Sequence, residues 1–193
     1  TLYEVLSSPT VALPAIMLTA WIISTNRMVV STVDIVGAFL NAKETYEVHM
    51  RLSKELANIL VDIDASRYKD FLCPDGSIIV KLEKALYGLV EAPRLWYDLL
   101  RTAIQESGFR ASEYDECVFV KHGSDNQIIG IMALHVDDLL IGCCTNDELN
   151  KISKTLKAKF KNITVKDGPI VDYLGMTLNF EHAGKVTDRK STR

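Results

Sequence analysis

Apolar residues recur at helical spacing in three stretches of the chain. We predict helices over residues 8–26, 93–107 and 145–160. The third stretch has the clearest beginning, because Thr145 and Glu148 match the capping box that opens many helices. Trp96 and Tyr97 lie in the second stretch, and we expect them in the core rather than on a base-stacking surface.

Short β-branched and apolar runs lie between these stretches and predict strands. The expected strands cover residues 28–36, 77–82, 117–121, 128–136 and 139–143. A closing hairpin is expected from residues 172–180 and 185–187, whereas the mixed pattern of residues 37–75 gives no clear assignment. Hairpins mixed with helices predict an α+β fold, in which an antiparallel sheet has its helices on one face.

Composition places the chain among ordinary globular proteins. Its 193 residues are 48% hydrophobic and 24% charged, which suggests one domain, or one and a fraction, with a stable core. The net charge of -3 argues against a polybasic nucleic-acid binder, although residues 151–193 hold ten Lys and Arg against four Asp and Glu. The longest apolar run, residues 11–23, is too short to span a membrane, and the four cysteines lack the spacing of a metal site.

Two adjacent acids, Asp137 and Asp138, interrupt an otherwise apolar stretch between residues 131 and 142. A hairpin turn is the simpler interpretation, because turns favour Asp. A metal site is the other, since neighbouring carboxylates repel each other unless a cation is bound, and Mg²⁺ prefers oxygen ligands. Asp34, near the end of the strand expected at residues 28–36, is the candidate for a third ligand. Spacing alone leaves both interpretations open.

Three blocks of sequence follow one another along the chain. They are Val-Asp-Ile-Val-Gly-Ala-Phe-Leu-Asn at 33–41, Lys-Leu-Glu-Lys-Ala-Leu-Tyr-Gly-Leu-Val-Glu-Ala-Pro-Arg-Leu-Trp-Tyr at 81–97 and His-Val-Asp-Asp at 135–138. Their ordered combination strongly resembles the reverse transcriptase of copia-type LTR retrotransposons, although each block alone is a weak signal. Smaller matches, such as Asp-Tyr-Leu-Gly-Met at 172–176, extend the resemblance over residues 8–186.

The resemblance implies a fold and a reaction. It implies a single domain over residues 1–193, with the palm and part of the fingers of a right-handed polymerase and without the N-terminal fingers, the thumb and the RNase H domain. The implied enzyme is an RNA-directed DNA polymerase, in which a primer 3′-hydroxyl attacks the α-phosphate of a deoxynucleotide with the help of two Mg²⁺ ions, or Mn²⁺.

The resemblance also implies partners. These are an RNA or DNA template with its primer, deoxynucleoside triphosphates, and the rest of the Pol polyprotein, including RNase H and integrase, with no membrane. The implied location is intracellular, in a cytoplasmic particle or the nucleus.

Particular residues receive roles from the same resemblance. Metal-binding and catalytic roles fall on Asp34, Asp137 and Asp138, with the main-chain carbonyl of Ile35 as a further metal ligand. Nucleotide-binding roles fall on Ala38, Phe39, Tyr87 and Gly88. Primer or template contacts fall on His135, Leu174, Gly175 and Met176. The bulky ring at position 39 is expected to exclude a 2′-hydroxyl and so to favour deoxynucleotides.

Three positions, in two places along the sequence, depart from the family pattern. His135 stands where the family usually has Tyr, which removes a hydroxyl contact near the primer end. Val90 and Glu91 stand where the family usually has Lys and Gln, and an acid near a phosphate-rich cleft weakens binding.

Three hypotheses about function follow. The chain is a competent core within a longer polyprotein, a non-catalytic remnant that folds and binds nucleic acid or a partner, or an unrelated metal-dependent nuclease. The Leu-Tyr-Gly-Leu block at 86–89, which hydrolysis does not need, argues against the nuclease.

Overall fold

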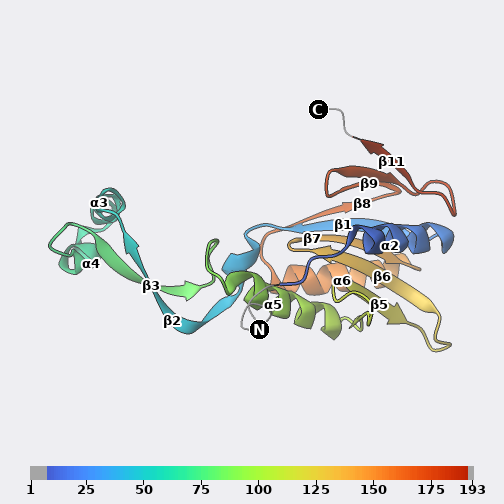
Figure 1. Ribbon diagram of the computed structural model, residues 1–193, viewed down its shortest axis with the longest axis horizontal. Coiled ribbons are helices and arrows are strands. Elements are labelled where there is room, and N and C mark those ends of the chain that lie inside the picture. Colours follow the sequence, from blue (N-terminus) through green and yellow to red (C-terminus); the bar gives the residue numbers. More distant parts are fainter. Residues whose placement is uncertain (1–7, 191–193) are drawn as a thin grey trace.

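An antiparallel sheet of six strands forms the body of the protein (Figure 1). The computed structural model describes residues 8–190. The strands follow the order β4-β5-β6-β7-β1-β8 across the sheet. Their bounds are β1 (Val29–Ile35), β4 (Arg110–Ala111), β5 (Val118–His122), β6 (Ile128–His135), β7 (Asp138–Cys143) and β8 (Ile163–Asp167). The central strands β6, β7 and β1 therefore come from two distant parts of the sequence.

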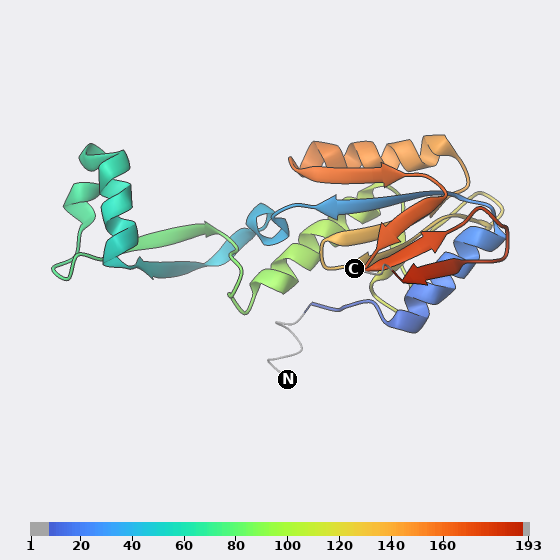
Figure 2. The ribbon, with the colours of Figure 1, turned by 90° about the horizontal axis from the view of Figure 1, so that it is seen from above.

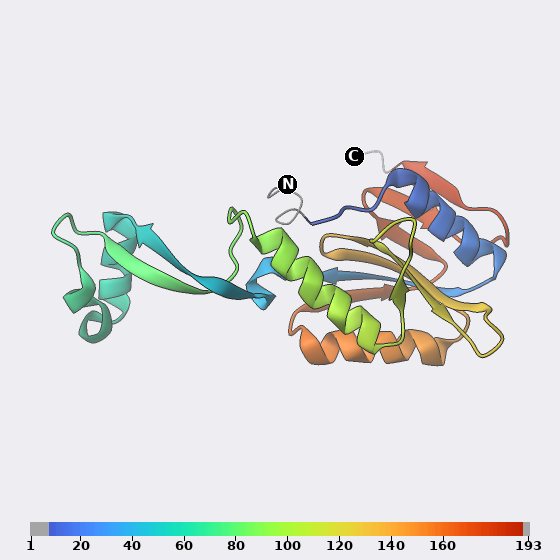
Figure 3. The same cartoon turned by 60° about the horizontal axis from the view of Figure 1, so that its bottom comes forward.

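Helices lie on both faces of this sheet (Figure 3). α5 (Ala92–Glu106) and α6 (Asn146–Lys159) cover one face, and α2 (Leu13–Thr25) covers the other. Two glycines mark the faces, because a Cβ at Gly130 would collide with Phe109, just after α5, whereas a Cβ at Gly142 would collide with Ile23 of α2. Gly142 pairs with Ile131, the neighbour of Gly130, so the two glycines belong to opposite faces.

The α+β fold is confirmed, but the helices are not confined to one face as expected. Residues 130–134 and 139–143 are buried without alternation, so both faces of β6 and β7 need cover. A three-stranded sheet of β9 (Ile170–Tyr173), β10 (Met176–Asn179) and β11 (Thr187–Lys190) completes the second cover. It lies beside α2, where the Ser24 hydroxyl donates a 3.1 Å hydrogen bond to the carbonyl of His182.

A two-stranded arm extends away from the body (Figure 1, Figure 2). It consists of β2 (Lys43–Leu52) and β3 (Ile78–Lys84), with α3 (Lys54–Ile63), α4 (Ala65–Tyr68) and the 3-10 turn η2 (Lys69–Phe71) at its far end, and η1 (Ala38–Asn41) joins it to β1. Among its described residues, the buried apolar side chains are Ala57 and Ile78, while Ile63 and Phe71 are exposed. Burial of one face of an element produces a period of apolar residues in the sequence. Because the arm buries few apolar side chains, residues 37–75 show no clear pattern.

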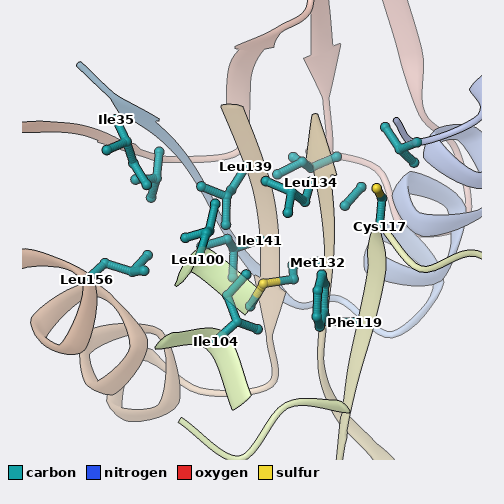
Figure 4. Packing of buried hydrophobic residues seen from close by; sticks show 14 of the residues in the cluster. Ile35, Leu100, Ile104, Cys117, Phe119, Met132, Leu134, Leu139, Ile141 and Leu156 are labelled. Atoms are coloured by element: carbon teal, nitrogen blue, oxygen red, sulfur yellow. The ribbon is translucent and has the colours of Figure 1, made fainter. Parts of the chain in front are cut away.

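The main core lies between the sheet and the two helices α5 and α6 (Figure 4). Leu100 and Ile104 of α5 and Leu156 of α6 point toward Leu139 and Ile141 of β7. All five side chains are fully buried. Each contributes about 1.5–3 kcal/mol by leaving water, so this layer fixes the position of β7.

Helix α2 begins later than the apolar pattern predicts. It starts at Leu13 rather than at residue 8. Pro14 occupies its first turn, where the N–H that proline lacks would have no partner within the helix. Within residues 8–190, no helix is both long and apolar enough to cross a membrane.

The C-terminal strands also differ from the sequence prediction. The stretch expected as one strand at residues 172–180 is the β9–β10 hairpin, because Leu174 and Gly175 have φ angles of 50° and 77°. Strand β8 was not expected at all. The helix cap at Thr145 is confirmed, since its side chain accepts a 3.2 Å hydrogen bond from the N–H of Glu148.

One carboxylate at the base of the arm is unfavourably placed. Both oxygen atoms of Glu44 are buried, and neither finds a hydrogen-bond partner among the described residues. Leaving a buried group unpaired costs about 1–3 kcal/mol, and more when it is charged. We therefore expect Glu44→Leu to raise the Tm in calorimetry, by about 2–4 °C for each kcal/mol regained.

Glu47→Leu on the same strand is the matched control for this prediction. The Glu47 side chain is 67% exposed, so its replacement is expected to change the Tm little. A Tm for Glu44→Leu at or below that of the wild type contradicts the prediction.

Candidate active site

Three acidic residues meet at one end of the sheet, where β1 ends and the two-residue β6–β7 turn lies. Asp34 and Asp138 stand directly opposite each other in the pairing of β1 with β7. Asp137 lies in the turn itself, and its carbonyl oxygen accepts a 3.1 Å hydrogen bond from the N–H of Ile35. Antiparallel pairing thus brings together acids that are far apart in the sequence.

Burial and mutual repulsion act on these carboxyl groups. Burial raises the pKa of Asp137, and the charge of Asp34 raises it further. Burial is also the main cause that raises the pKa of Asp138, and the charges of Asp137 and Asp34 add to it. The three carboxylates therefore interact through a partly desolvated end of the sheet.

The donor chemistry of this acidic site fits a divalent cation. Carboxylate oxygens are the ligands that Mg²⁺ prefers, and a cation would offset the burial and the mutual repulsion that raise the pKa of Asp137 and Asp138. In residues 8–190, however, no group of three or more His, Cys, Asp and Glu side chains is arranged to hold an ion. The carboxylates would have to turn toward a shared ion, and the carbonyl of Ile35 as a ligand stays a prediction.

A cavity of about 100 Å³ lies beside Asp34 and Asp138. Its other walls are Thr32, Val33, Thr164, Lys166 and Asp172. Thr164 is paired with Asp34, and the ammonium of Lys166 lies 3.9 Å from the carboxylate of Asp172. Sequence reasoning missed Thr164 and Lys166 because it assigned no strand to residues 163–167. The alternation of Ile163 and Val165 with polar residues was the available signal.

An aromatic pair stands next to the acids. The rings of Phe39 and Tyr87 have centroids 4.4 Å apart and are tilted by 43°. Phe39 is 8% exposed, whereas Tyr87 is 56% exposed. Burial, and then the charges of Asp137 and Asp34, raise the pKa of Tyr87, which places its hydroxyl within electrostatic reach of the acidic site. Tyr87 therefore forms the solvent side of this pair.

The other two residues expected to bind a nucleotide differ in their access to solvent. Ala38 is the first residue of η1, and its side chain is fully buried. Gly88 has a φ angle of 101°, and a Cβ built there would meet no atom within 4 Å. The surface beside Tyr87 is thus open at Gly88 and closed at Ala38.

His135 and the β9–β10 hairpin flank the acids on the other side. His135 pairs with Asp138, and its Nδ1 atom is buried without a hydrogen-bond partner in the described part of the chain. The Tyr173 hydroxyl donates a 3.1 Å hydrogen bond to the carbonyl of Ala133, and burial and then Asp138 raise the Tyr173 pKa. The hairpin that contains Leu174, Gly175 and Met176 therefore lies close to the acidic site, with β9 against β1 and β7 and the Tyr173 side chain reaching β6.

Comparisons with known proteins cover nearly the whole chain. The family model described as "Reverse transcriptase (RNA-dependent DNA polymerase)" matches residues 1–189. The Pol polyprotein of transposon TNT 1-94 from Nicotiana tabacum is 27% identical over 184 residues, which are 95% of this chain and 12% of that protein. The Pol polyprotein of transposon RE2 from Arabidopsis thaliana is 33% identical over 140 residues, which are 72% of this chain and 8% of that protein. The chain thus spans a small part of these relatives.

A comparison with solved structures finds a telomerase. The apo telomerase of Candida tropicalis, truncated from its C-terminal domain, matches 92% of this chain and 40% of its own, with 12% identity and a TM-score of 0.48.

The burial of Asp138 and its repulsion by the other two acids give a stability prediction. Because the folded state raises the Asp138 pKa above its ordinary value of 3.8, folding favours the protonated form, and stability falls as the pH rises through that raised pKa. We therefore expect Asp138→Asn to raise the metal-free Tm at pH 7 and to lose this advantage below about pH 3.8. Thermal melts of the wild type and Asp138→Asn, from pH 7 to below pH 3.8, measure the difference in Tm.

Asp125→Asn, in the exposed turn between β5 and β6, is the control and is expected to leave the Tm nearly unchanged. An Asp138→Asn protein that melts below the wild type at pH 7 would show that the folded state does not disfavour the charged carboxylate.

Proposed function

Because the chain belongs to the reverse transcriptase (RNA-dependent DNA polymerase) family, as the match over residues 1–189 shows, we propose that it forms the polymerase active site of a retrotransposon Pol polyprotein. The proposed reaction adds a deoxynucleotide to a primer 3′-hydroxyl on an RNA or DNA template. The observation that supports it most directly is the pairing of Asp34 with Asp138, with Asp137 in the adjoining turn. Three neighbouring carboxylates support the proposal because a phosphoryl-transfer enzyme needs such groups to bind its metal ions.

We assign Mg²⁺ binding to Asp34, Asp137 and Asp138, with the carbonyl of Ile35. Bound there, two Mg²⁺ ions would supply charge stabilisation for the attacking and leaving oxygens of the reacting phosphate. The chain itself contributes position, because the pairing of β1 with β7 holds two of the carboxylates on rigid strands. The raised pKa values of Asp137 and Asp138 mark a site that is partly protected from water, where charges interact strongly.

The aromatic pair supports an assignment for the incoming nucleotide. The exposed face of Tyr87 and the open surface at Gly88 form the proposed nucleotide floor. Phe39, held beneath Tyr87, forms the bulky wall that would reject a 2′-hydroxyl. The β9–β10 hairpin, on the far side of Asp138, is the proposed primer contact, together with His135.

The division of the fold into palm and fingers follows from the same assignment. The six-stranded sheet with its acids has the role of the palm, and the arm of β2 and β3 has the role of part of the fingers. The Phe39–Tyr87 pair lies at the base of the arm, so the proposed nucleotide site lies between the two parts.

One observation favours the competing hypothesis of a folded remnant without activity. The Nδ1 atom of His135 is buried without a partner in the described residues, directly beside Asp138. A buried polar atom without a partner is unfavourable. An imidazole also has no hydroxyl group to offer to the primer end. Such a remnant would still bind nucleic acid or another partner.

Primer extension with Asp138→Asn decides between catalysis and binding alone. We expect the wild type to extend a primer in the presence of Mg²⁺ and Asp138→Asn to lose roughly a hundredfold or more of the rate, as when an electrostatic group is removed from an active site. The variant is expected to stay folded, so lost extension cannot be assigned to unfolding. Asp125→Asn serves again as the control that keeps its rate. The proposal is contradicted if a folded wild type binds primer and template but neither binds Mg²⁺ nor extends the primer.

Substitution of His135 tests the primer contact. We expect His135→Tyr to raise the extension rate by about fivefold, the effect of one hydrogen bond gained in place of an unpaired buried nitrogen. Single-turnover extension assays measure the rate, and His122→Tyr at the exposed end of β5 is the matched control. A rate that does not rise would show that His135 is tolerated at the primer end.

A further inference from the structure

The backbone at Val136 adopts a conformation that β-branched residues rarely take. Its φ angle is 57°, in the left-handed region, where a branched Cβ crowds the backbone. Such a conformation persists only where the surrounding structure imposes it. Val136 begins the β6–β7 turn and directly precedes Asp137 and Asp138, so the group that imposes it also sets the direction of these carboxylates.

Trp96 supplies such a group from α5. Its indole N–H donates a hydrogen bond of 2.7 Å to the main-chain carbonyl of Val136. The side chain is 1% exposed and meets the ring of Phe160 edge-on, with centroids 5.1 Å apart, so packing fixes its orientation. The indole ring has a single hydrogen-bond donor, and here that donor is used on the carbonyl of Val136 in the turn.

The next carbonyl of the turn is held from another element. The oxygen of Asp137 accepts the N–H of Ile35 in β1 at 3.1 Å. Two successive peptide groups are therefore tied to α5 and to β1. The turn cannot rotate either peptide without leaving a polar group unpaired in the interior.

We propose that Trp96 is a positioning residue, whose indole N–H holds Val136 in its left-handed conformation and thereby directs Asp137 and Asp138 toward the end of β1. This inference rests on the proposed function, because it treats these acids as metal ligands. The hydrogen bond and the turn, however, are tested without metal. A tryptophan that only fills the core gives different results in the same experiments.

The test removes the N–H and keeps the shape of the ring. The protein has two tryptophans, and Trp21 is 54% exposed, so Trp21→Phe is both the background and the control. In this background, 3-benzothienylalanine at position 96 replaces the N–H with sulfur, and Trp96→Phe gives a second variant. Val136→Gly is added to each, because glycine takes a positive φ angle without strain.

Hydrogen exchange of the Ile35 amide, measured by NMR without metal, reports on the turn. Loss of the indole N–H is expected to speed this exchange about tenfold, the effect of roughly one hydrogen bond, with less change at Ile141 in the middle of β7. Val136→Gly is expected to restore the slow exchange. Three outcomes would overturn the inference. The exchange at Ile35 is unchanged, it changes equally at Ile35 and Ile141, or Val136→Gly does not restore slow exchange.

Mn²⁺ binding, measured by electron paramagnetic resonance, reports on the carboxylates. We expect about tenfold weaker binding in the variants without the indole N–H, and recovery with Val136→Gly. Binding of unchanged strength in those variants overturns the positioning role. A wild type that binds no Mn²⁺ counts against the proposed function, and the Ile35 exchange then still decides whether Trp96 holds the turn.

Discussion

The antiparallel register between β1 and β7 is the constraint on which the rest of the structure depends. It sets Asp34 opposite Asp138 and Val30 opposite Gly142. A slip of one residue would turn Asp34 to the face that α5 and α6 cover, where no water or cation reaches it. The close approach of Ile23 to Gly142 opposes such a slip, because any larger side chain at that place would collide with α2. The register of β1 and β7 therefore fixes the pairing of Asp34 with Asp138 together with the place of Gly142 against α2.

The end of the sheet that holds the acids is unfavourable in several ways, and the core offsets this cost. Burial and repulsion raise the pKa of Asp137 and Asp138, and the left-handed backbone at Val136 costs about 1–3 kcal/mol. Behind the turn, Leu139 and Ile141 are fully buried against α5 and α6. Strain and unpaired charge collect where the chemistry is proposed, which is the usual distribution in a protein with an active site.

The arm and the body meet at the Phe39–Tyr87 pair. Phe39 lies where the chain leaves β1 for the arm, and Tyr87 lies where the chain returns from β3. The arm buries few apolar side chains of its own, so its position relative to the body depends on this junction. A nucleotide bound beside Tyr87 would therefore contact both parts, which connects the geometry of the arm to the proposed chemistry.

The sequence by itself determined the α+β class, the helix from Thr145 and the family, because periodic apolar residues and ordered motifs are local properties of a chain. It also named Asp34, Asp137 and Asp138 as candidates, but not their distances or their electrostatic coupling. Tertiary structure alone decided that helices cover both faces, that the strand at residues 163–167 pairs beside Asp34, and that Trp96 donates to Val136. These features depend on contacts between residues distant in the sequence. The alternation of Ile163 and Val165 with polar residues marks a strand, but no period in the sequence names the partner of that strand.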